Sequence, residues 1–212
     1  MSVDATLGEL QRHGFPMGGE PLVALDFADT LMTATDPETD LLAAPAQAAA
    51  WWRVELARLP ESAVPDPAAA RRLRTAVRDL LDAHLERRAP RPTSIEDVNA
   101  AAAAVPTSVR LTADIGDWHA ETRWHAEFGG NAALAAIARE TIELLSSPDR
   151  LGRLRRCANP TCSMLFLAET TRRQWCTANV CGNRMRVARH YQRTRAARTE
   201  TRHDHQDVQR FP

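Results

Sequence analysis

"CANPTC" (residues 157–162) and "WCTANVCGNR" (residues 175–184) contain all four cysteines of this 212-residue chain. The spacing is C-x4-C, thirteen intervening residues, and C-x4-C again, which makes two matched pairs. Structural zinc takes four tetrahedral ligands, and thiolates a few residues apart reach one ion without straining the backbone. The predicted ligands of one structural Zn²⁺ ion are Cys157, Cys162, Cys176 and Cys181.

The four thiols have other uses besides structural zinc. Four cysteines also ligate iron–sulfur clusters, and cysteines pair as disulfides or stay unbound. Thiolates that release zinc on oxidation would make a redox sensor. A catalytic zinc is not expected, because it keeps one coordination position open and four cysteines leave none.

The residues around the cysteines indicate a treble-clef-like module, a β hairpin followed by a helix. "RLRRCANPTCSMLFLAE" (residues 153–169) is typical of a strand, an Asn-Pro turn carrying the first cysteine pair, and a returning strand. The second pair lies where a helix should begin, and free amides at a helix N-terminus stabilise thiolate. A module of about 40 residues buries too little apolar surface to fold alone, so zinc is expected to contribute on the order of 10 kcal/mol.

Charge is divided unevenly along the chain, although the formal net charge is zero. Residues 1–150 hold 14 Arg and 23 Asp or Glu, a formal charge of −9, whereas residues 151–202 hold 12 Arg and two Glu, a formal charge of +10. A basic segment attached to an acidic body favours a polyanionic partner.

The basic helix expected after Cys181 has the pattern of a nucleic-acid contact. Three of its arginines share one face, and an Asn-Arg pair at its start suits contact with base edges. DNA is therefore the predicted partner. Arginines that neutralise the −2 charge of a zinc–tetrathiolate centre, or that bind the acidic body, a protein partner or a second copy, are the alternatives. The predicted nucleic-acid-binding residues are Arg172, Arg173, Asn183, Arg184, Arg186, Arg189 and Arg193.

The first 150 residues predict a mainly α body with a small β hairpin. Alternation in "SVRLTADIGDWHAETRWHA" (residues 108–126) indicates the hairpin, with Gly116 at its turn. "PLVALDFADT" (residues 21–30) is interpreted as a short strand. The expected helices cover residues 39–59, 67–88, a segment capped by Ser94, and 131–145.

Other conspicuous residues of the body have structural explanations. His119, Glu121 and His125 are interpreted as exposed polar residues opposite a tryptophan face, with a second metal site as the alternative. Asp26 and Asp29 are interpreted as turn or cap residues, with paired catalytic carboxylates as the alternative. No glycine-rich phosphate loop or catalytic triad order is present, so an enzyme is not expected. The tryptophans expected in the core, with a ligand pocket as the alternative, are Trp51, Trp52, Trp118 and Trp124.

The chain carries no visible targeting signal. "MSVDATLGELQRH" (residues 1–13) has neither a basic start nor an apolar run. No apolar stretch approaches the roughly 18–20 residues of a membrane span. The expected location is the cytoplasm, without a membrane partner.

"CANPTC…RRQWCTANVCGNRMRVARHY" resembles the CGNR zinc finger of bacterial proteins that carry an N-terminal ABATE domain. Both cysteine pairs, Trp175 before Cys176, and the literal Cys-Gly-Asn-Arg at residues 181–184 match over about residues 153–195. "LDFADT" and the helix order extend the likeness to residues 20–147, while Asp29, Ala168 and Arg186 depart from the family pattern. The family is described as predicted stress-induced transcription regulators.

These observations predict three parts. Residues 1–150 form an ABATE-like helical domain that senses a signal or mediates assembly; the sequence identifies no ligand for it. Residues 151–198 form the CGNR zinc module with its basic helix, and residues 199–212 form a disordered polar tail. The predicted function is a zinc-dependent, DNA-binding transcription regulator. A zinc-stabilised protein-interaction module and a thiol redox sensor are the alternatives.

Overall fold

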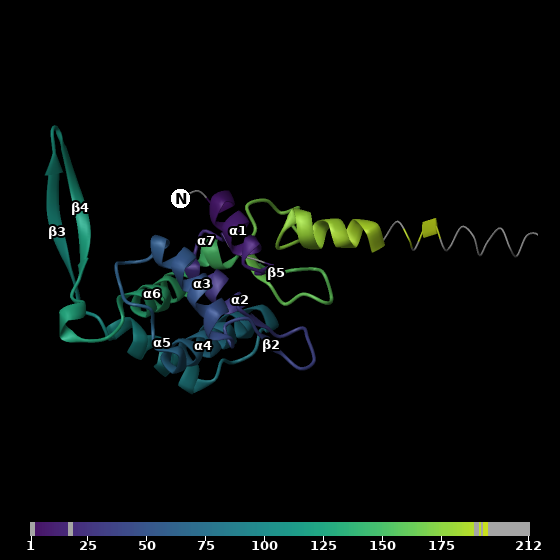
Figure 1. Ribbon diagram of the computed structural model, residues 1–212, viewed down its shortest axis with the longest axis horizontal. Coiled ribbons are helices and arrows are strands. Elements are labelled where there is room, and N and C mark those ends of the chain that lie inside the picture. Colours follow the sequence, from purple (N-terminus) through teal and green to yellow (C-terminus); the bar gives the residue numbers. More distant parts are fainter. Residues whose placement is uncertain (1–2, 17–18, 189–190, 192, 195–212) are drawn as a thin grey trace, which may run out of the picture.

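The computed structural model describes residues 3–16, 19–188, 191, 193 and 194. Helices form the body, a two-stranded arm made of β3 (Thr107–Asp114) and β4 (Asp117–Trp124) projects from one end, and the C-terminal helix projects from the opposite end (Figure 1). The predicted fold class, mainly α with a small β hairpin and a C-terminal module of a β hairpin plus a helix, is confirmed. The body helices are α1 (Val3–Arg12), α2 (Val23–Asp29), α3 (Pro45–Glu55), η1 (Leu56–Arg58), α4 (Pro67–Glu86), α5 (Pro92–Ala103), η2 (Ala126–Phe128), α6 (Ala132–Ser146) and α7 (Pro148–Leu151).

The remaining strands are short and pair antiparallel. β1 (Leu31–Met32) pairs with β2 (Thr39–Asp40), and β5 (Leu154–Arg156) pairs with β6 (Leu165–Leu167). Among the described residues, no helix combines the length and the hydropathy needed to cross a bilayer.

Helix α2 is the centre of the body, and all seven of its residues are buried. The prediction of a strand at residues 21–30 is therefore wrong. A short, continuous apolar run has no period that separates a buried strand from a buried helix, and contacts with α4 and α6 decide for the helix. The Phe27 ring lies 5.6 Å from that of Trp51 and 5.7 Å from that of Trp52, so the core assignment of these two tryptophans is confirmed.

Proline marks the first turn of α3, α4 and α5, where a missing N–H costs nothing. Residues 39–40 form a strand, so the helix expected from residue 39 begins only at Pro45. Asp66 caps α4 by accepting the N–H of Ala69 at 2.8 Å. Ser94 is not the cap of α5, because that helix already begins at Pro92 and Ser94 is buried in its first turn.

The arm matches the predicted hairpin. Gly116 at its turn has a φ of +99°, a left-handed conformation that glycine adopts at little cost. Trp118, however, is 74% exposed, so its assignment to the core is wrong: the arm projects beyond the body. Trp124, at the base of the arm, is partly buried, and the Arg139 guanidinium carbon lies 4.6 Å from its ring centroid.

The C-terminal module packs against the body. The side chains of β6 are buried in the same hydrophobic core as those of α2 and α4. Beyond the β5–β6 hairpin, a π-helical turn, η3 (Ala178–Gly182), continues as α-helix through residue 188, and residues 191, 193 and 194 are helical as well. The predicted hairpin and basic helix are therefore present, while the predicted tail at 199–212 lies outside the described residues.

Candidate metal centre

The four predicted ligands converge between the β5–β6 hairpin and the start of the C-terminal helix. Their Sγ atoms all lie within 4.8 Å of one another, and those of Cys162 and Cys176 are 3.9 Å apart. All four are free thiols. Sulfurs at about 2.3 Å from one tetrahedral zinc ion stand about 3.8 Å apart, whereas a disulfide bond measures about 2.05 Å. The cluster therefore fits one zinc ion and excludes disulfides in this structure.

Local hydrogen bonds shape the two cysteine loops. The N–H of Cys162 donates to the carbonyl of Asn159 at 2.9 Å, which closes the Asn-Pro turn. The N–H of Ala158 donates to the carbonyl of Gln174 at 2.9 Å and joins the first loop to the second. The side-chain amide of Asn159 donates to Sγ of Cys181 at 3.5 Å. A donor directed at sulfur stabilises a thiolate ligand.

Four thiols this close cannot all ionise without a cation. The Cys162 and Cys176 thiols hydrogen-bond to Cys157, which lowers the pKa of Cys157 and raises the pKa values of the other two. A divalent cation compensates the charge of four thiolates and lets all of them deprotonate. The donor set is thus suited to zinc and leaves no open position for a substrate.

A buried carboxylate at the end of α2 anchors the module to the body. Both oxygens of Asp29 accept the N–H of Leu165, at 2.9 and 3.0 Å, and one of them lies 3.3 Å from Nη1 of Arg78. Nη2 of Arg78 donates to the carbonyl of Ser163 at 2.6 Å. Burial raises the pKa of Asp29, while Arg78 and the Leu165 N–H oppose that rise. Strand β6 is therefore held by side chains of α2 and α4.

Glu20 provides a second anchor. One carboxylate oxygen accepts the N–H of Leu167 at 3.1 Å, and the other lies 2.7 Å from Nη2 of Arg173. Arg173 also donates to the carbonyl of Cys176 at 2.7 Å, and its guanidinium carbon lies 4.4 Å from the ring centroid of Phe166. Arg173, predicted as a nucleic-acid contact, is therefore engaged by the protein itself, between the body and the metal site.

A second buried cluster of charged side chains is centred on Arg58 and contacts the backbone of Glu20. Nη1 of Arg58 is 2.8 Å from Asp26 and 2.7 Å from Glu55, and its Nη2 donates to the carbonyl of Glu20. Two buried carboxylates thus share one guanidinium. Burial raises the pKa of Glu55 to about 7 and also raises that of Asp26, which the charge of Glu55 raises further. Asp26 also accepts the N–H of Gly19 at 2.8 Å, but it does so from within α2, so its interpretation as a turn or cap residue is wrong.

Another arginine of the basic segment binds the body from outside. Nη2 of Arg156 lies 2.7 Å from Asp82 and 2.8 Å from Glu86, both on α4. The hypothesis that some of these arginines pair with the acidic body is therefore confirmed for Arg156 and Arg173.

The other predicted nucleic-acid contacts lie on the surface. Arg172 is exposed on the loop before Cys176. Among the described residues of this module, Arg156 and Arg173 form ion pairs with carboxylates, whereas Arg172, Arg184, Arg186 and Arg193 form none. Arg189 lies outside the described residues. The exposed candidates on the helix are Asn183, Arg184, Arg186 and Arg193.

The two histidines considered for a second metal site stay apart from the zinc cluster. His119 lies 3.8 Å from Asp114, and His125 lies 2.9 Å from Glu127, in both cases on or near the arm. In the part of the chain that the structure describes, a group of side chains suited to a metal forms only at the four cysteines.

Sequence reasoning missed the anchors. Asp29 was expected to be a turn or cap residue, but it accepts the backbone N–H of Leu165, 136 positions away. Glu20 and Arg78 carried no pattern that distinguishes them from solvated charges. A carboxylate inside an apolar run, as in "LDFADT" (residues 25–30), is the one signal available, because a buried charge needs partners.

Residues 22–148, more than half of the chain, match the family model ABATE, whose description is "Putative stress-induced transcription regulator". The chain belongs to the ABATE family. In this ABATE protein, residues 153–194 match the CGNR zinc finger model, so the four-cysteine cluster is the finger's site for one zinc ion. The resemblance seen in the sequence is confirmed for both regions. No curated protein matches the chain significantly.

Proposed function

We propose that this ABATE protein is a regulator that binds DNA through the exposed arginines of its zinc module. The supporting observation is the division of those arginines into two groups. Arg156 and Arg173 are paired with the body, whereas Arg184, Arg186 and Arg193 lie exposed on a helix that extends away from it (Figure 1). An arginine that stabilises the fold is paired with a carboxylate. The arginines without such a partner are available to bind phosphate groups.

Zinc gives this helix its position. Cys181 lies in the turn that begins it, and the remaining three ligands lie on loops joined to β5 and β6. Because β6 is anchored by Asp29 and Glu20, the metal connects the helix rigidly to the body. A projecting helix of this kind fits the major groove of B-DNA, where guanidinium groups contact phosphates and guanine edges.

The test is the salt dependence of binding to a generic DNA duplex by the zinc-loaded full chain. About four phosphate contacts give a slope near −3.6 in a plot of log K against log salt concentration. Arg186→Gln should reduce the magnitude of that slope by about 0.9, because it removes one phosphate contact. Arg110→Gln is the matched control: it removes the same charge from an exposed position on the arm, at the other end of the molecule, and should leave the slope unchanged.

The second candidate function is a protein-binding helix. Val187 is 47% exposed and Tyr191 is 71% exposed on the same helix, and exposed apolar and aromatic side chains are typical of protein interfaces. Absence of duplex binding at low salt by the zinc-loaded protein would favour this candidate. Equal effects of Arg186→Gln and Arg110→Gln would do the same, because they would indicate attraction by net charge alone.

A further inference from the structure

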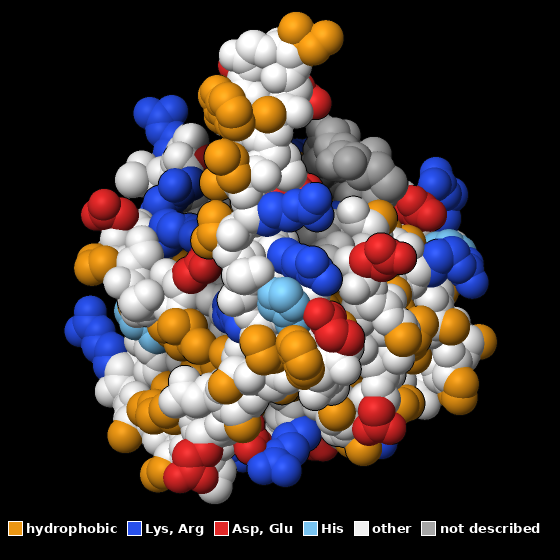
Figure 2. Space-filling model, turned by 90° about the vertical axis from the view of Figure 1, so that its left-hand side faces the viewer, with side chains coloured by type: hydrophobic (Ala, Val, Ile, Leu, Met, Phe, Trp, Pro, Cys, Tyr) orange, Lys and Arg blue, Asp and Glu red, His pale blue; other side chains and the backbone are white. Residues whose placement is uncertain are grey.

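The β3–β4 arm has an apolar face that no described part of the chain covers. The register places Val109 opposite Thr122, Leu111 opposite Ala120, and Ala113 opposite Trp118, and side chains of opposed residues lie on the same face. Val109, Leu111 and Trp118 are 80%, 67% and 74% exposed. Figure 2 shows hydrophobic side chains gathered along one side of the projecting arm.

The opposite face of the arm is polar. Its opposed pairs are Ser108 with Arg123, Arg110 with Glu121, and Thr112 with His119. This strict alternation is the pattern of a sheet with one face in water and the other buried. An isolated two-stranded hairpin is marginally stable in water, so the apolar face requires a cover from outside the molecule described here.

We propose that the arm is a dimerisation element, whose apolar face packs against the same face of the arm in a second copy of this chain. From Thr107 to Ala113 and from Trp118 to Trp124, this face carries no ionisable side chain. A surface without charge can meet its own copy across a two-fold axis with no like-charge repulsion and no buried unpaired ion. The proposal stands independently of DNA binding.

The exposed area is sufficient for a dimer. Ile115 at the turn and Phe128 near the base are also exposed, the latter by 76%, which makes five large apolar residues on and around the arm. At roughly 150 Å² for each aromatic side chain and somewhat less for each aliphatic one, full burial of these residues would contribute on the order of 700 Å² per copy. Two copies would bury about 1,400 Å², within the range of about 1,200–2,000 Å² typical of specific interfaces.

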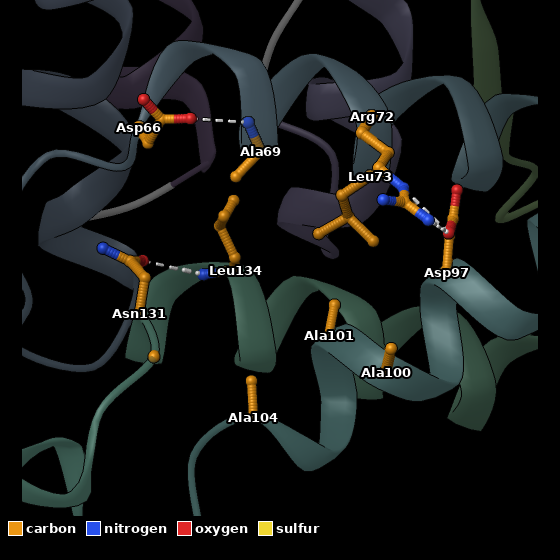
Figure 3. A pocket seen from close by; sticks show the side chains of 11 residues that line it. Asp66, Ala69, Arg72, Leu73, Asp97, Ala100, Ala101, Ala104, Asn131 and Leu134 are labelled. Carbon is orange, nitrogen blue, oxygen red and sulfur yellow. Dashed lines mark hydrogen bonds and ion pairs between the residues drawn. The ribbon is translucent and has the colours of Figure 1, made fainter.

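A groove on the body is a poorer match for the arm. The groove between α4, α5 and α6 has a volume of about 570 Å³ and a floor of leucine and alanine side chains (Figure 3). Its rim, however, carries Asp66, Arg72 and Asp97, with Arg72 and Asp97 paired at 2.5 Å. An arm inserted there would bury charged groups against Trp118, whereas arm-to-arm packing buries none.

The assembly would leave both zinc modules accessible. The arm and the C-terminal helix lie at opposite ends of the molecule, so a dimer joined by the arms would carry its two basic helices on its outer ends (Figure 1).

The experiment measures the oligomeric state of the zinc-loaded full chain by sedimentation equilibrium. We expect a concentration-dependent dimer for the unaltered chain and a dimer dissociation constant at least 100-fold weaker for Trp118→Glu. His119→Glu is the matched control: it adds the same side chain one position along β4, on the polar face, and should leave the dimer intact. Circular dichroism and zinc content should be unchanged in both variants, because both positions are exposed on the projecting part of the arm.

Three results would overturn the proposal. The first is a monomer at every concentration for the unaltered chain, and the second is equal weakening of the dimer by Trp118→Glu and His119→Glu. The third is dissociation by Ala100→Glu, in the groove, as strong as that by Trp118→Glu; this result would place the arm of the second copy in the groove. A dimer that resists Ala100→Glu and fails with Trp118→Glu supports packing of arm on arm.

Discussion

The β5–β6 hairpin and the β3–β4 arm are both two-stranded antiparallel ribbons, yet every residue of β6 is buried and nearly every residue of the arm is exposed. The difference lies in what binds each ribbon from outside. Carboxylates of Asp29 and Glu20 accept the free N–H groups of β6, and the cysteine cluster closes its loop. The described part of the chain gives the arm no such support. A two-stranded ribbon needs a partner outside itself to be stable. For the β5–β6 hairpin the partners are the metal site and the buried carboxylates; for the arm, by our inference, the partner is a second copy of the chain.

Removal of the metal should have the largest effect, and it should act on the β5–β6 hairpin and not on the arm. Cys176→Ser, or chelation of the unaltered chain, removes a contribution on the order of 10 kcal/mol to folding of the zinc module. Amide hydrogen exchange should then accelerate throughout β5 and β6, while the exchange of arm amides stays as it was. Persistent protection of β6 in metal-free protein would show that the carboxylate anchors suffice without zinc.

Loss of an anchor should have the next largest effect. Asp29→Ala leaves the buried Arg78 and the Leu165 N–H without this acceptor, which should lower the free energy of unfolding by about 3–5 kcal/mol. Urea unfolding of zinc-loaded protein measures the change. Asp29→Asn is the control, because its amide oxygen still accepts the Leu165 N–H, and it should cost less. Equal losses for the two variants would contradict this account of the anchor.

The sharing of the Arg58 guanidinium by Asp26 and Glu55 predicts that the free energy of unfolding depends on pH. The pKa of Glu55 is about 7 in the folded protein and near 4.5 when the group is solvated, so the folded state binds the extra proton between these values. The associated stability is complete below pH 4.5 and is lost as the pH rises to 7, a change on the order of 3 kcal/mol. Urea unfolding at saturating zinc across this interval measures it.

Glu55→Gln tests the assignment, because the substitution removes one titrating group and should reduce the slope; the slope that remains belongs to other buried carboxyl groups with raised pKa values, Asp26 and Asp29 among them. An unchanged slope in that variant would assign the pH dependence to a different group.

The smallest effects compare Gly116, at the turn of the arm, with Gly130, in the loop between η2 and α6. A Cβ on Gly130 would lie 2.6 Å from the carbonyl oxygen of Ala104, so Gly130→Ala should destabilise the body by roughly 1–3 kcal/mol. A Cβ on Gly116 would meet nothing within 4 Å, and only its φ of +99° resists substitution. Gly116→Ala should therefore cost about 1 kcal/mol, confined to the arm, with no change in the urea midpoint of the body. A shift of that midpoint by Gly116→Ala would show that the arm is coupled to the core.

Much of the local structure was predictable. The cysteine spacing predicted the metal cluster, strict alternation predicted the arm with its turn at Gly116, and helical periodicity placed α4 and α6 to within a few residues. Helix α2 was not predictable, because an entirely buried segment shows no amphipathic period. The alternation around Trp118 correctly predicted an apolar face on the arm. It could not predict whether the body of the same chain or another molecule covers that face.

By itself, the sequence determined which groups share a metal and which amphipathic segments are helix or hairpin, because ligand spacing and side-chain period are properties of neighbouring residues. Only the tertiary structure decided which charged side chains are paired within the protein and which side chains are exposed to solvent. Asp29 meets Leu165 across 136 positions of chain, and Arg173 turns inward to Glu20 while Arg186 stays outside. The physical reason is desolvation: whether a carboxylate or guanidinium loses its water depends on what distant segments pack over it, and no local pattern records that.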